Sequence, residues 1–324
     1  MVEIKLDLKD KKIIAELSLN ARENISDVAK KVGLSKQVVK YRLENLEKRG
    51  IIEGYYAILN INKLGYLYYR FFVKFQNVNP EKENEIIEFC RKHKKIGRVF
   101  QLDGDWDFAV AVWAKDIIEF EEVIDEILDK FGKYFEEKLI SVATRIHHLK
   151  YKFLLNKEDS TEFVLGGKVE ETKLDEIDYN IIGILTKDAR KSLLEIGEEL
   201  KLHPKVVKYR INALLKKKII LGFNVKLNHR LLGYDHHKVF LNLTNISKES
   251  ILKLITYLKS LTNSIYITKA VGIAELEFEV MVRSNEEFHD IMRELRYKFS
   301  DLIKNYSSFI IYYEPYINYL PLKK

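Results

Sequence analysis

The sequence contains a single cysteine, Cys90, among its 324 residues, so no disulfide can form within the chain. Because structural disulfides belong to oxidising compartments, this scarcity favours a cytoplasmic protein. No apolar run approaches the roughly 18 residues that a membrane-spanning helix requires. The first residues mix charged and apolar side chains, unlike the basic and then apolar stretch of a secretory signal. We therefore expect a chain that is neither secreted nor embedded in a membrane.

Patterns that would indicate an enzyme or a metalloprotein are also missing. The segment from Asp103 resembles the start of a calcium loop, but Phe108 and Ala114 stand where that loop requires Gly and Glu. The adjacent pairs His147-His148 and His236-His237 point to opposite faces of a strand and cannot share one ion. No serine or cysteine nucleophile set is present. We expect no catalytic residue, no metal and no cofactor.

The most informative feature that is present is an internal repeat. A shift of 168 residues lays Val38–Arg42 on the identical string Val206–Arg210 and Gly65-Tyr66 on Gly233-Tyr234, without a gap. This period is too long for a solenoid, whose repeats span roughly 20 to 50 residues. Two copies of about 150 residues each lie within the usual size of domains. The chain is therefore a tandem duplication of a whole module.

The first part of each copy is predicted to be helical. Apolar residues recur at helical spacing after Asp7, which can cap the first helix. A second helix is expected between Asn24 and Gly33. After a tight turn, a third helix is expected from Ser35 to Gly50, a residue suited to a left-handed cap. The result is a helix-turn-helix in each copy.

The third helix has the composition of a DNA-reading element. Its apolar stripe of Val39, Leu43 and Leu46 must face the core, which leaves its amino-terminal turns free for the major groove. Such a basic helix can also be a merely solvated face, but two in register argue against that, and the net charge of +7 agrees with an anionic partner. Glutamine and lysine can reach base edges there, while lysine, tyrosine and arginine hold phosphates. We predict contacts to double-stranded DNA from Lys36, Gln37, Lys40, Tyr41, Arg42, Lys205, Lys208, Tyr209 and Arg210.

The second part of each copy changes period, and alternating strands rich in Tyr, Phe and Val flank two helical stretches. In copy one these segments are strands at 55–61 and 65–76, a helix at 80–93, strands at 97–102 and 106–114, a helix at 117–131 and a strand at 138–150. Copy two repeats the βαββαβ order, which predicts a ferredoxin-like domain of four antiparallel strands with two helices on one face. The predicted fold class is α+β, in two tandem copies of a three-helix helix-turn-helix domain followed by this ferredoxin-like domain.

Polar and turn-prone residues mark the joint between the copies. The expected units are a helix-turn-helix domain at 1–54, a regulatory domain at 55–152, a linker at 153–172, a second helix-turn-helix domain at 173–222 and a second regulatory domain at 223–324.

Several motifs occur together in copy one: Leu6-Asp7-x-x-Asp10, Asn20-Ala21-Arg22, Val32-Gly33-Leu34-Ser35, Gly50-Ile51-Ile52-x-Gly54-Tyr55 and Gly104-x-Trp106-Asp107. In this order they resemble the leucine-responsive/AsnC (Lrp/AsnC) family of prokaryotic transcription regulators. The resemblance implies helix-turn-helix domains joined to regulatory (RAM) domains that pair through their sheets, and it implies self-association. It also implies a small effector, typically an amino acid, bound in clefts between regulatory domains, here at Gly104, Asp105 and Asp107. One module is an entire ordinary family member, so the chain resembles a covalent dimer.

Copy two departs from the family pattern. Lys201-Leu202-His203 followed by Pro204 replaces the Gly-Leu-Ser turn, although proline is tolerated at the first helical position. Gly104-Asp105-Trp106-Asp107 becomes Gly272-Ile273-Ala274-Glu275, and Glu275, Glu277 and Glu279 alternate along one strand face. These glutamates argue against an effector site in copy two. They can instead pair with basic groups or line an altered pocket.

The favoured function is a sequence-specific transcription regulator with two DNA-reading heads. Because Lys36-Gln37 and Pro204-Lys205 differ, its operator is predicted to be asymmetric. Two alternatives stay open. One is an enzyme resembling siroheme decarboxylases, which are built from a similar pair of modules. The other is an architectural protein that binds DNA without reading its sequence.

Overall fold

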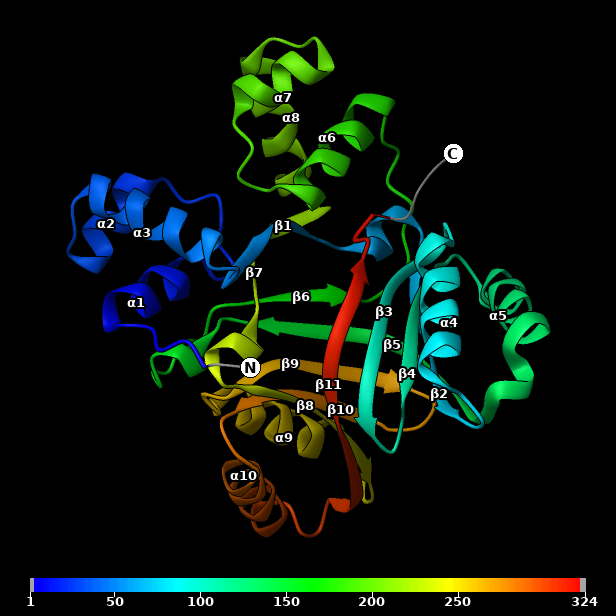
Figure 1. Cartoon of the computed structure of the whole chain (residues 1–324). Helices are drawn as coiled ribbons and strands as arrows, with labels where there is room; N and C mark the ends of the chain where they lie inside the picture. Colours follow the sequence, from blue (N-terminus) through cyan, green and yellow to red (C-terminus); the bar gives the residue numbers. More distant parts are fainter. Residues whose placement is uncertain (1–2, 321–324) are drawn as a thin grey trace.

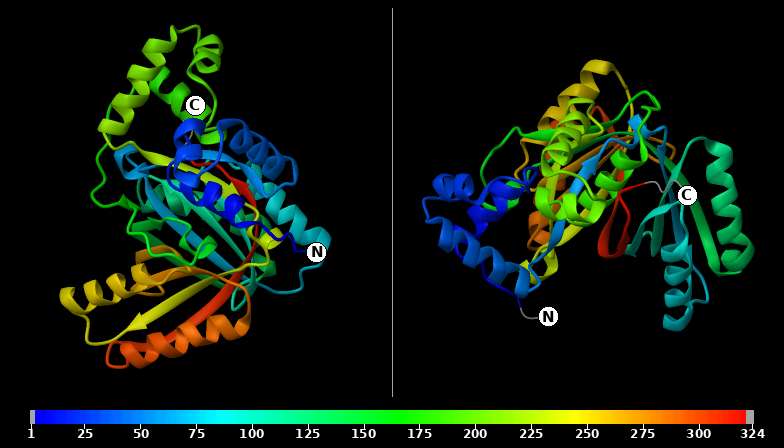
Figure 2. Two further views of the ribbon diagram at one scale, coloured as in Figure 1. Left: turned by 90° about the vertical axis from the view of Figure 1, so that its left-hand side faces the viewer. Right: turned by 90° about the horizontal axis from the view of Figure 1, so that it is seen from above.

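The computed structural model describes residues 3–320 and is a mixed α+β molecule with two helical heads on one side of a β-rich body (Figures 1 and 2). The first head contains α1 (Leu8–Leu17), α2 (Ile25–Val32) and α3 (Lys36–Lys48). The second contains α6 (Glu176–Lys187), α7 (Leu193–Leu200) and α8 (Pro204–Lys216). Both helix-turn-helix predictions agree with these elements.

A two-stranded antiparallel ribbon lies beneath the heads. It pairs β1 (Ile52–Leu59) with β7 (Ile220–Leu227), so that Tyr55 lies opposite Val225. Each strand leads through a short 3₁₀ turn, η1 (Ile61–Leu64) or η4 (His229–Leu232), into the body. The domain limits expected at 54/55 and 222/223 fall inside these strands.

The body is a closed β-barrel made by both copies. Copy one supplies strands in the order β5-β2-β4-β3, and copy two supplies them in the order β11-β8-β10-β9. The two sheets join at both edges, β3 with β11 and β9 with β5, through antiparallel pairs. Closure leaves no unpaired edge in the ring. The strands are β2 (Leu67–Phe75), β3 (Ile96–Gly104), β4 (Phe108–Ala114), β5 (Phe135–Leu149), β8 (Asp235–Leu243), β9 (Ser264–Val271), β10 (Leu276–Val282) and β11 (Ile303–Ile317).

Two helices cover the outer face of each sheet. In copy one these are α4 (Pro80–Lys92) and α5 (Ile117–Phe131), followed by the short η2 (Gly132–Tyr134). In copy two they are α9 (Lys248–Ser260) and α10 (Asn285–Lys298). Separate apolar cores fill the two helix–sheet layers, and each contains a buried phenylalanine, Phe108 or Phe278. The helices and strands thus follow the βαββαβ order that the sequence predicts.

The joint between the copies is part of the fold. After η3 (Lys152–Leu154), a strand that the sequence did not suggest, β6 (Glu162–Gly166), pairs with β5. Beyond it, the amide of Thr172 donates to the carbonyl of Lys63. The segment expected as a linker therefore lies against copy one. Within residues 3–320 no helix is long and apolar enough to cross a membrane.

Candidate nucleic-acid interface

The third helix of the first head, α3, is built to present its amino-terminal turns. The Ser35 hydroxyl accepts from the amide of Val38 and caps it. Val39, Leu43 and Leu46 are buried, as predicted. On the other face, four of the five residues predicted to reach DNA are exposed; they are Lys36, Gln37, Lys40 and Tyr41. Tyr41 has 66% of its surface exposed, so its ring has no core role and is free to contact a ligand.

The equivalent helix of the second head, α8, survives the loss of the Gly-Leu-Ser turn. Lys201 takes the left-handed conformation of the missing glycine at φ 55°, at a cost of roughly 1–2 kcal/mol. The His203 ring replaces the serine cap by accepting from the amide of Lys205 at 3.2 Å. Lys205, Lys208 and Tyr209 are exposed, and Tyr209 reaches 71%. Both heads thus present a lysine and a tyrosine at matching positions.

Three of the predicted phosphate contacts have partners inside the protein: Lys40 lies 3.8 Å from Glu44, and both arginines pair with aspartates. Arg42 pairs with Asp7 and Asp10, each at 2.7 Å. Arg210 repeats this with Asp175 at 2.5 Å and Asp178 at 3.1 Å. These arginines tie α3 to α1 and α8 to α6, and about a quarter of each side chain stays exposed. A DNA contact from either arginine remains a prediction.

A reciprocal contact joins the heads to each other; we call Arg22 and Arg190 the arginine latch. Arg22 donates to the carbonyls of Ala189 and Lys191, and Arg190 donates to the carbonyl of Ala21 at 2.6 Å. Burial and the charge of Arg190 lower the pKa of Arg22. The sequence showed Arg22 and Arg190 only as repeated residues, and their role follows from the pairing of β1 with β7. The latch fixes how the two reading helices lie relative to each other.

A buried amide connects the ribbon to the barrel. Asn224, on β7, accepts from the amide of Leu19 in the first head at 2.9 Å. Its side-chain NH₂ lies 3.2 Å from the hydroxyls of Tyr56 and Tyr151 and 3.1 Å from Nε2 of His148. We call these four side chains the Asn224 hub. Asparagine takes the place that Tyr56 has in copy one, and this difference between the copies is the only sequence signal for the hub.

In the turn that was expected to bind an effector, two of the three predicted residues have structural roles. A Cβ atom on Gly104 would meet the Cβ of Phe309 at 3.2 Å, and its φ of 130° suits glycine. Asp107 accepts from the amide of Phe75 at 2.7 Å, joining the turn to β2. Asp105 is exposed. The glycine and Asp107 thus shape the turn, and effector binding at Gly104, Asp105 and Asp107 remains a prediction.

Comparison with known proteins identifies both heads as helix-turn-helix domains. A family model described as winged helix-turn-helix DNA-binding matches residues 6–53, and the AsnC-type helix-turn-helix domain matches residues 174–215. The HTH-type transcriptional regulator LrpA of Pyrococcus horikoshii is 34% identical over 128 residues, which cover 40% of this chain and 87% of LrpA. The uncharacterized HTH-type transcriptional regulator PH1055 of the same organism is 32% identical over 164 residues, 49% of this chain and all of that protein. The chain belongs to the Lrp/AsnC family.

Among solved structures, a siroheme decarboxylase resembles this Lrp/AsnC chain over nearly its whole length. The siroheme decarboxylase NirDL has a TM-score of 0.62 and covers 96% of this chain, which in turn covers 93% of NirDL. The sequence identity is 14%. At that level the likeness shows the shared fold of two fused modules and nothing about chemistry.

Copy two departs from the Lrp/AsnC pattern most clearly on β10, and its glutamates pair with basic groups of both copies inside the barrel. Arg70 of copy one forms a buried ion pair with Glu277, and Lys238 lies 2.9 Å from Glu277 and 2.7 Å from Glu279. Burial alone would raise the pKa of Glu277, but the charges of Arg70 and Lys238 outweigh it and hold the pKa below its usual value. Glu275 instead accepts from the amide of Leu243, as Asp107 does from Phe75. The acidic face does both: its glutamates pair with basic groups, and Glu279 also lines a pocket.

The cysteine and three of the histidines considered above have structural roles. Burial raises the pKa of Cys90 to about 12, so its thiol stays protonated. His147 contacts Glu162 at 2.9 Å, His148 belongs to the Asn224 hub, and His236 contacts Glu279 at 2.8 Å. Among residues 3–320 no group of three histidines, cysteines or acidic side chains is placed to hold a metal ion.

Proposed function

We propose that this chain is a sequence-specific DNA-binding transcription regulator that acts as a covalent pseudo-dimer. One observation carries the proposal: two heads expose the same lysine and tyrosine pair, Lys40-Tyr41 and Lys208-Tyr209, while reciprocal contacts fix their relative position. Paired reading helices of this kind enter successive major grooves roughly 34–36 Å apart. Relatives such as LrpA, named as transcriptional regulators, support the same function.

The salt dependence of DNA binding tests whether both heads take part. Each phosphate contact contributes a slope of about −0.9 in log K against log salt. The double variant Lys40→Ala, Lys208→Ala should therefore lose about two units of slope, and each single variant about one. Lys92→Ala, on the outer helix α4, is the matched control and should leave the slope unchanged. A wild-type slope in the double variant would remove these lysines from the interface.

We assign the βαββαβ half of each copy to the ferredoxin-like RAM type. The strand orders β5-β2-β4-β3 and β11-β8-β10-β9 support this assignment, because in each the first and third strands lie between the fourth and the second. In such a regulator a small effector changes DNA affinity, and Gly104, Asp105 and Asp107 stay the family-based candidates for an amino-acid-like ligand. Self-association through the regulatory domains is part of the same proposal.

We infer that the chain is not an enzyme. Arg70 and Lys238 pair with the glutamates of β10, His148 bonds to Asn224, and the relatives above 30% identity are named as regulators. Because NirDL has a similar fold over nearly the whole chain, siroheme decarboxylase activity has to be tested directly. A tetrapyrrole absorption band in the purified protein, or loss of carboxyl groups from added siroheme, would contradict the inference.

A competition assay with bulk DNA distinguishes a sequence-specific DNA-binding protein from an architectural one. A specific binder prefers its own site over bulk DNA by a factor of roughly a thousand or more. If bulk DNA competes as well as the specific site does, the protein binds DNA without sequence preference and the proposal of a sequence-specific regulator is wrong.

A further inference from the structure

The barrel encloses a cavity of about 100 Å³ to which both copies contribute. Each of the ring strands provides lining residues, so the space lies inside the barrel, and β6 of the joint adds Leu165. A second cavity of about 180 Å³ adjoins it and shares Tyr56, Arg98, Tyr266 and Tyr319 among its lining residues. For comparison, an engineered cavity of roughly 150 Å³ accepts benzene. The first cavity alone is smaller than this, so a molecule of one ring has to extend into the second cavity.

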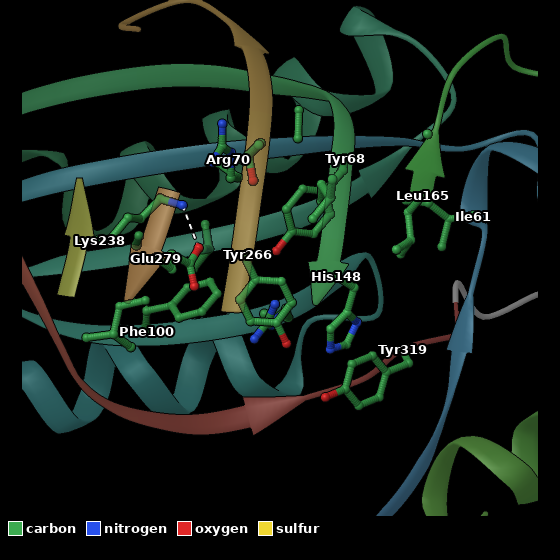
Figure 3. A pocket seen from close by; sticks show the side chains of 18 of the residues that line it. Ile61, Tyr68, Arg70, Phe100, His148, Leu165, Lys238, Tyr266, Glu279 and Tyr319 are labelled. Atoms are coloured by element: carbon green, nitrogen blue, oxygen red, sulfur yellow. Dashed lines mark hydrogen bonds and ion pairs between the residues drawn. The ribbon is translucent and has the colours of Figure 1, made fainter. Parts of the chain in front are cut away.

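Aromatic and polar groups gather in one part of the cavity. In the view of Figure 3, Tyr68, His148, Tyr266 and Tyr319 form one group, and the ion pair of Lys238 with Glu279 lies to its left. The His148 and Tyr266 rings lie 4.6 Å apart, and Tyr319 stacks on Tyr56 at 4.3 Å. Such rings favour a flat apolar partner, and phenol hydroxyls can donate to or accept from it.

The charged groups of the cavity balance one another. Arg70 and Lys238 pair with the two glutamates of β10, and Arg98 pairs with Glu314. Burial and the nearby charge of Arg98 lower the pKa of His148 to about 3, so this ring is neutral. A charged ligand would enter this buried space without a counter-charge, which is costly. The lining thus selects against anions and cations alike.

We propose that this cavity binds an uncharged small molecule with one aromatic ring and a hydrogen-bonding group, and that its occupancy acts on the DNA-reading heads. The route is the Asn224 hub. Tyr56 and His148 line the cavity, and both bond to Asn224, which in turn holds the backbone of Leu19 in the first head. Two members of the hub, Asn224 and Tyr56, lie on the ribbon that joins the heads. The effect on DNA rests on the proposed function, whereas binding to the cavity does not.

Three probes of one size and different charge test the ligand class. Benzamide is uncharged, benzoate is an anion and benzylamine is a cation at pH 7.5. Titration calorimetry with the full chain should show saturable binding of benzamide and at least tenfold weaker binding of both charged probes. Equal or tighter binding of benzoate or benzylamine would overturn the proposed chemistry. No binding of benzamide would overturn the site itself.

Neighbouring positions on β6 provide a matched pair of variants that locates the binding. Leu165 lines the cavity, whereas Val164 is 40% exposed and does not. Leu165→Trp should fill the space and abolish benzamide binding, and Val164→Trp should leave it intact. Urea unfolding of both variants checks that they fold. Tyr266→Phe, which keeps the ring, should weaken benzamide severalfold if the hydroxyl bonds to it. Benzamide binding that persists in the folded Leu165→Trp protein would place the probe elsewhere and overturn the site.

A DNA titration with and without benzamide tests the coupling separately. Saturating benzamide should change the DNA dissociation constant at least threefold in the wild type and in Val164→Trp, but not in Leu165→Trp. Benzamide binding without any change in DNA affinity would overturn the coupling. A chain that binds no DNA would contradict the proposed function, while the calorimetric titration would still decide whether the cavity takes the ligand.

Discussion

At the scale of single residues, the two copies are complementary rather than equivalent. Arg70 and Lys238 occupy the same position in the repeat, but only copy two carries glutamates on the facing strand, at 277 and 279, where copy one has Ala109 and Ala111. One pair of carboxylates therefore neutralises the cations of both copies. Pairing copy one with another copy one would bury two arginines without partners, which costs several kcal/mol for each ion.

Glu277→Gln should destabilise the chain strongly, because it leaves Arg70 buried beside a neutral side chain. We expect a loss of roughly 3–5 kcal/mol in the free energy of unfolding, measured from urea titrations. Arg70→Met combined with Glu277→Met should recover most of this loss, since Lys238 retains Glu279. Glu121→Gln, on the exposed face of α5, is the control and should change stability little. A fully stable Glu277→Gln protein would show that the ion pair has no such role.

Two histidines, the buried His148 and the half-buried His229, make stability depend on pH. Burial, followed by nearby positive charge, lowers the pKa of His148 and of His229 to about 3. The unfolded chain binds these protons near pH 6.5, so the folded state loses stability as the pH falls from about 6.5 towards 3, by roughly 1.4 kcal/mol per unit for each ring. Urea midpoints at pH 7.5, 6.0 and 5.0 should decline accordingly, and His148→Gln should reduce the slope by one proton. Equal slopes in both proteins would exclude His148 as a cause.

At the scale of elements, the ribbon and the arginine latch decide how the heads cooperate. The two ends of the ribbon have equivalent contacts. The backbone amide of Asn60 donates to the carbonyl of Ile219, and the backbone amide of Asn228 donates to the carbonyl of Ile51, each at 2.9 Å. These contacts, related by approximate two-fold symmetry, fix α3 and α8 relative to each other in the absence of DNA. Such preorganisation increases affinity because less ordering is needed on binding.

Loss of the arginine latch should affect only DNA that engages both heads. The double variant Arg22→Gln, Arg190→Gln should bind a two-half-site fragment roughly tenfold more weakly, because charge-assisted hydrogen bonds between the heads are lost. A fragment with a single half-site should bind as before, and Arg91→Gln on α4 should behave as wild type on both. If the single half-site is weakened equally, the arginines contact DNA and do not align the heads.

Local patterns predicted the elements well but could not predict the contacts between copies. Helical and alternating periodicity, with caps such as Asp7 and Ser35, gave the helices and most strands, because these depend on neighbouring residues. The strand β6 was missed because its five residues follow a polar stretch and pair only with β5. The Asn224 hub joins residues 73 to 168 positions apart, and Arg70 and Glu277 are 207 positions apart; no local pattern encodes such contacts.

At the scale of the whole molecule, duplication places in one chain what otherwise requires two. The barrel closes through the pairs β3–β11 and β9–β5, both of which join copy one to copy two. Once the copies are linked, each can diverge, and the differences on β10, in the hub and at the starts of α3 and α8 are of that kind. A single chain thus offers two DNA-reading heads that are similar but not identical.

The measurement that tests this most directly is a footprint, with stoichiometry, on DNA selected from a random oligonucleotide pool. One chain should protect two non-identical half-sites whose centres lie one helical turn, about 10 base pairs, or a multiple of it apart. Titration should saturate at one chain per pair of half-sites. A strictly palindromic site that saturates at one chain per half-site would contradict the account of a covalent pseudo-dimer.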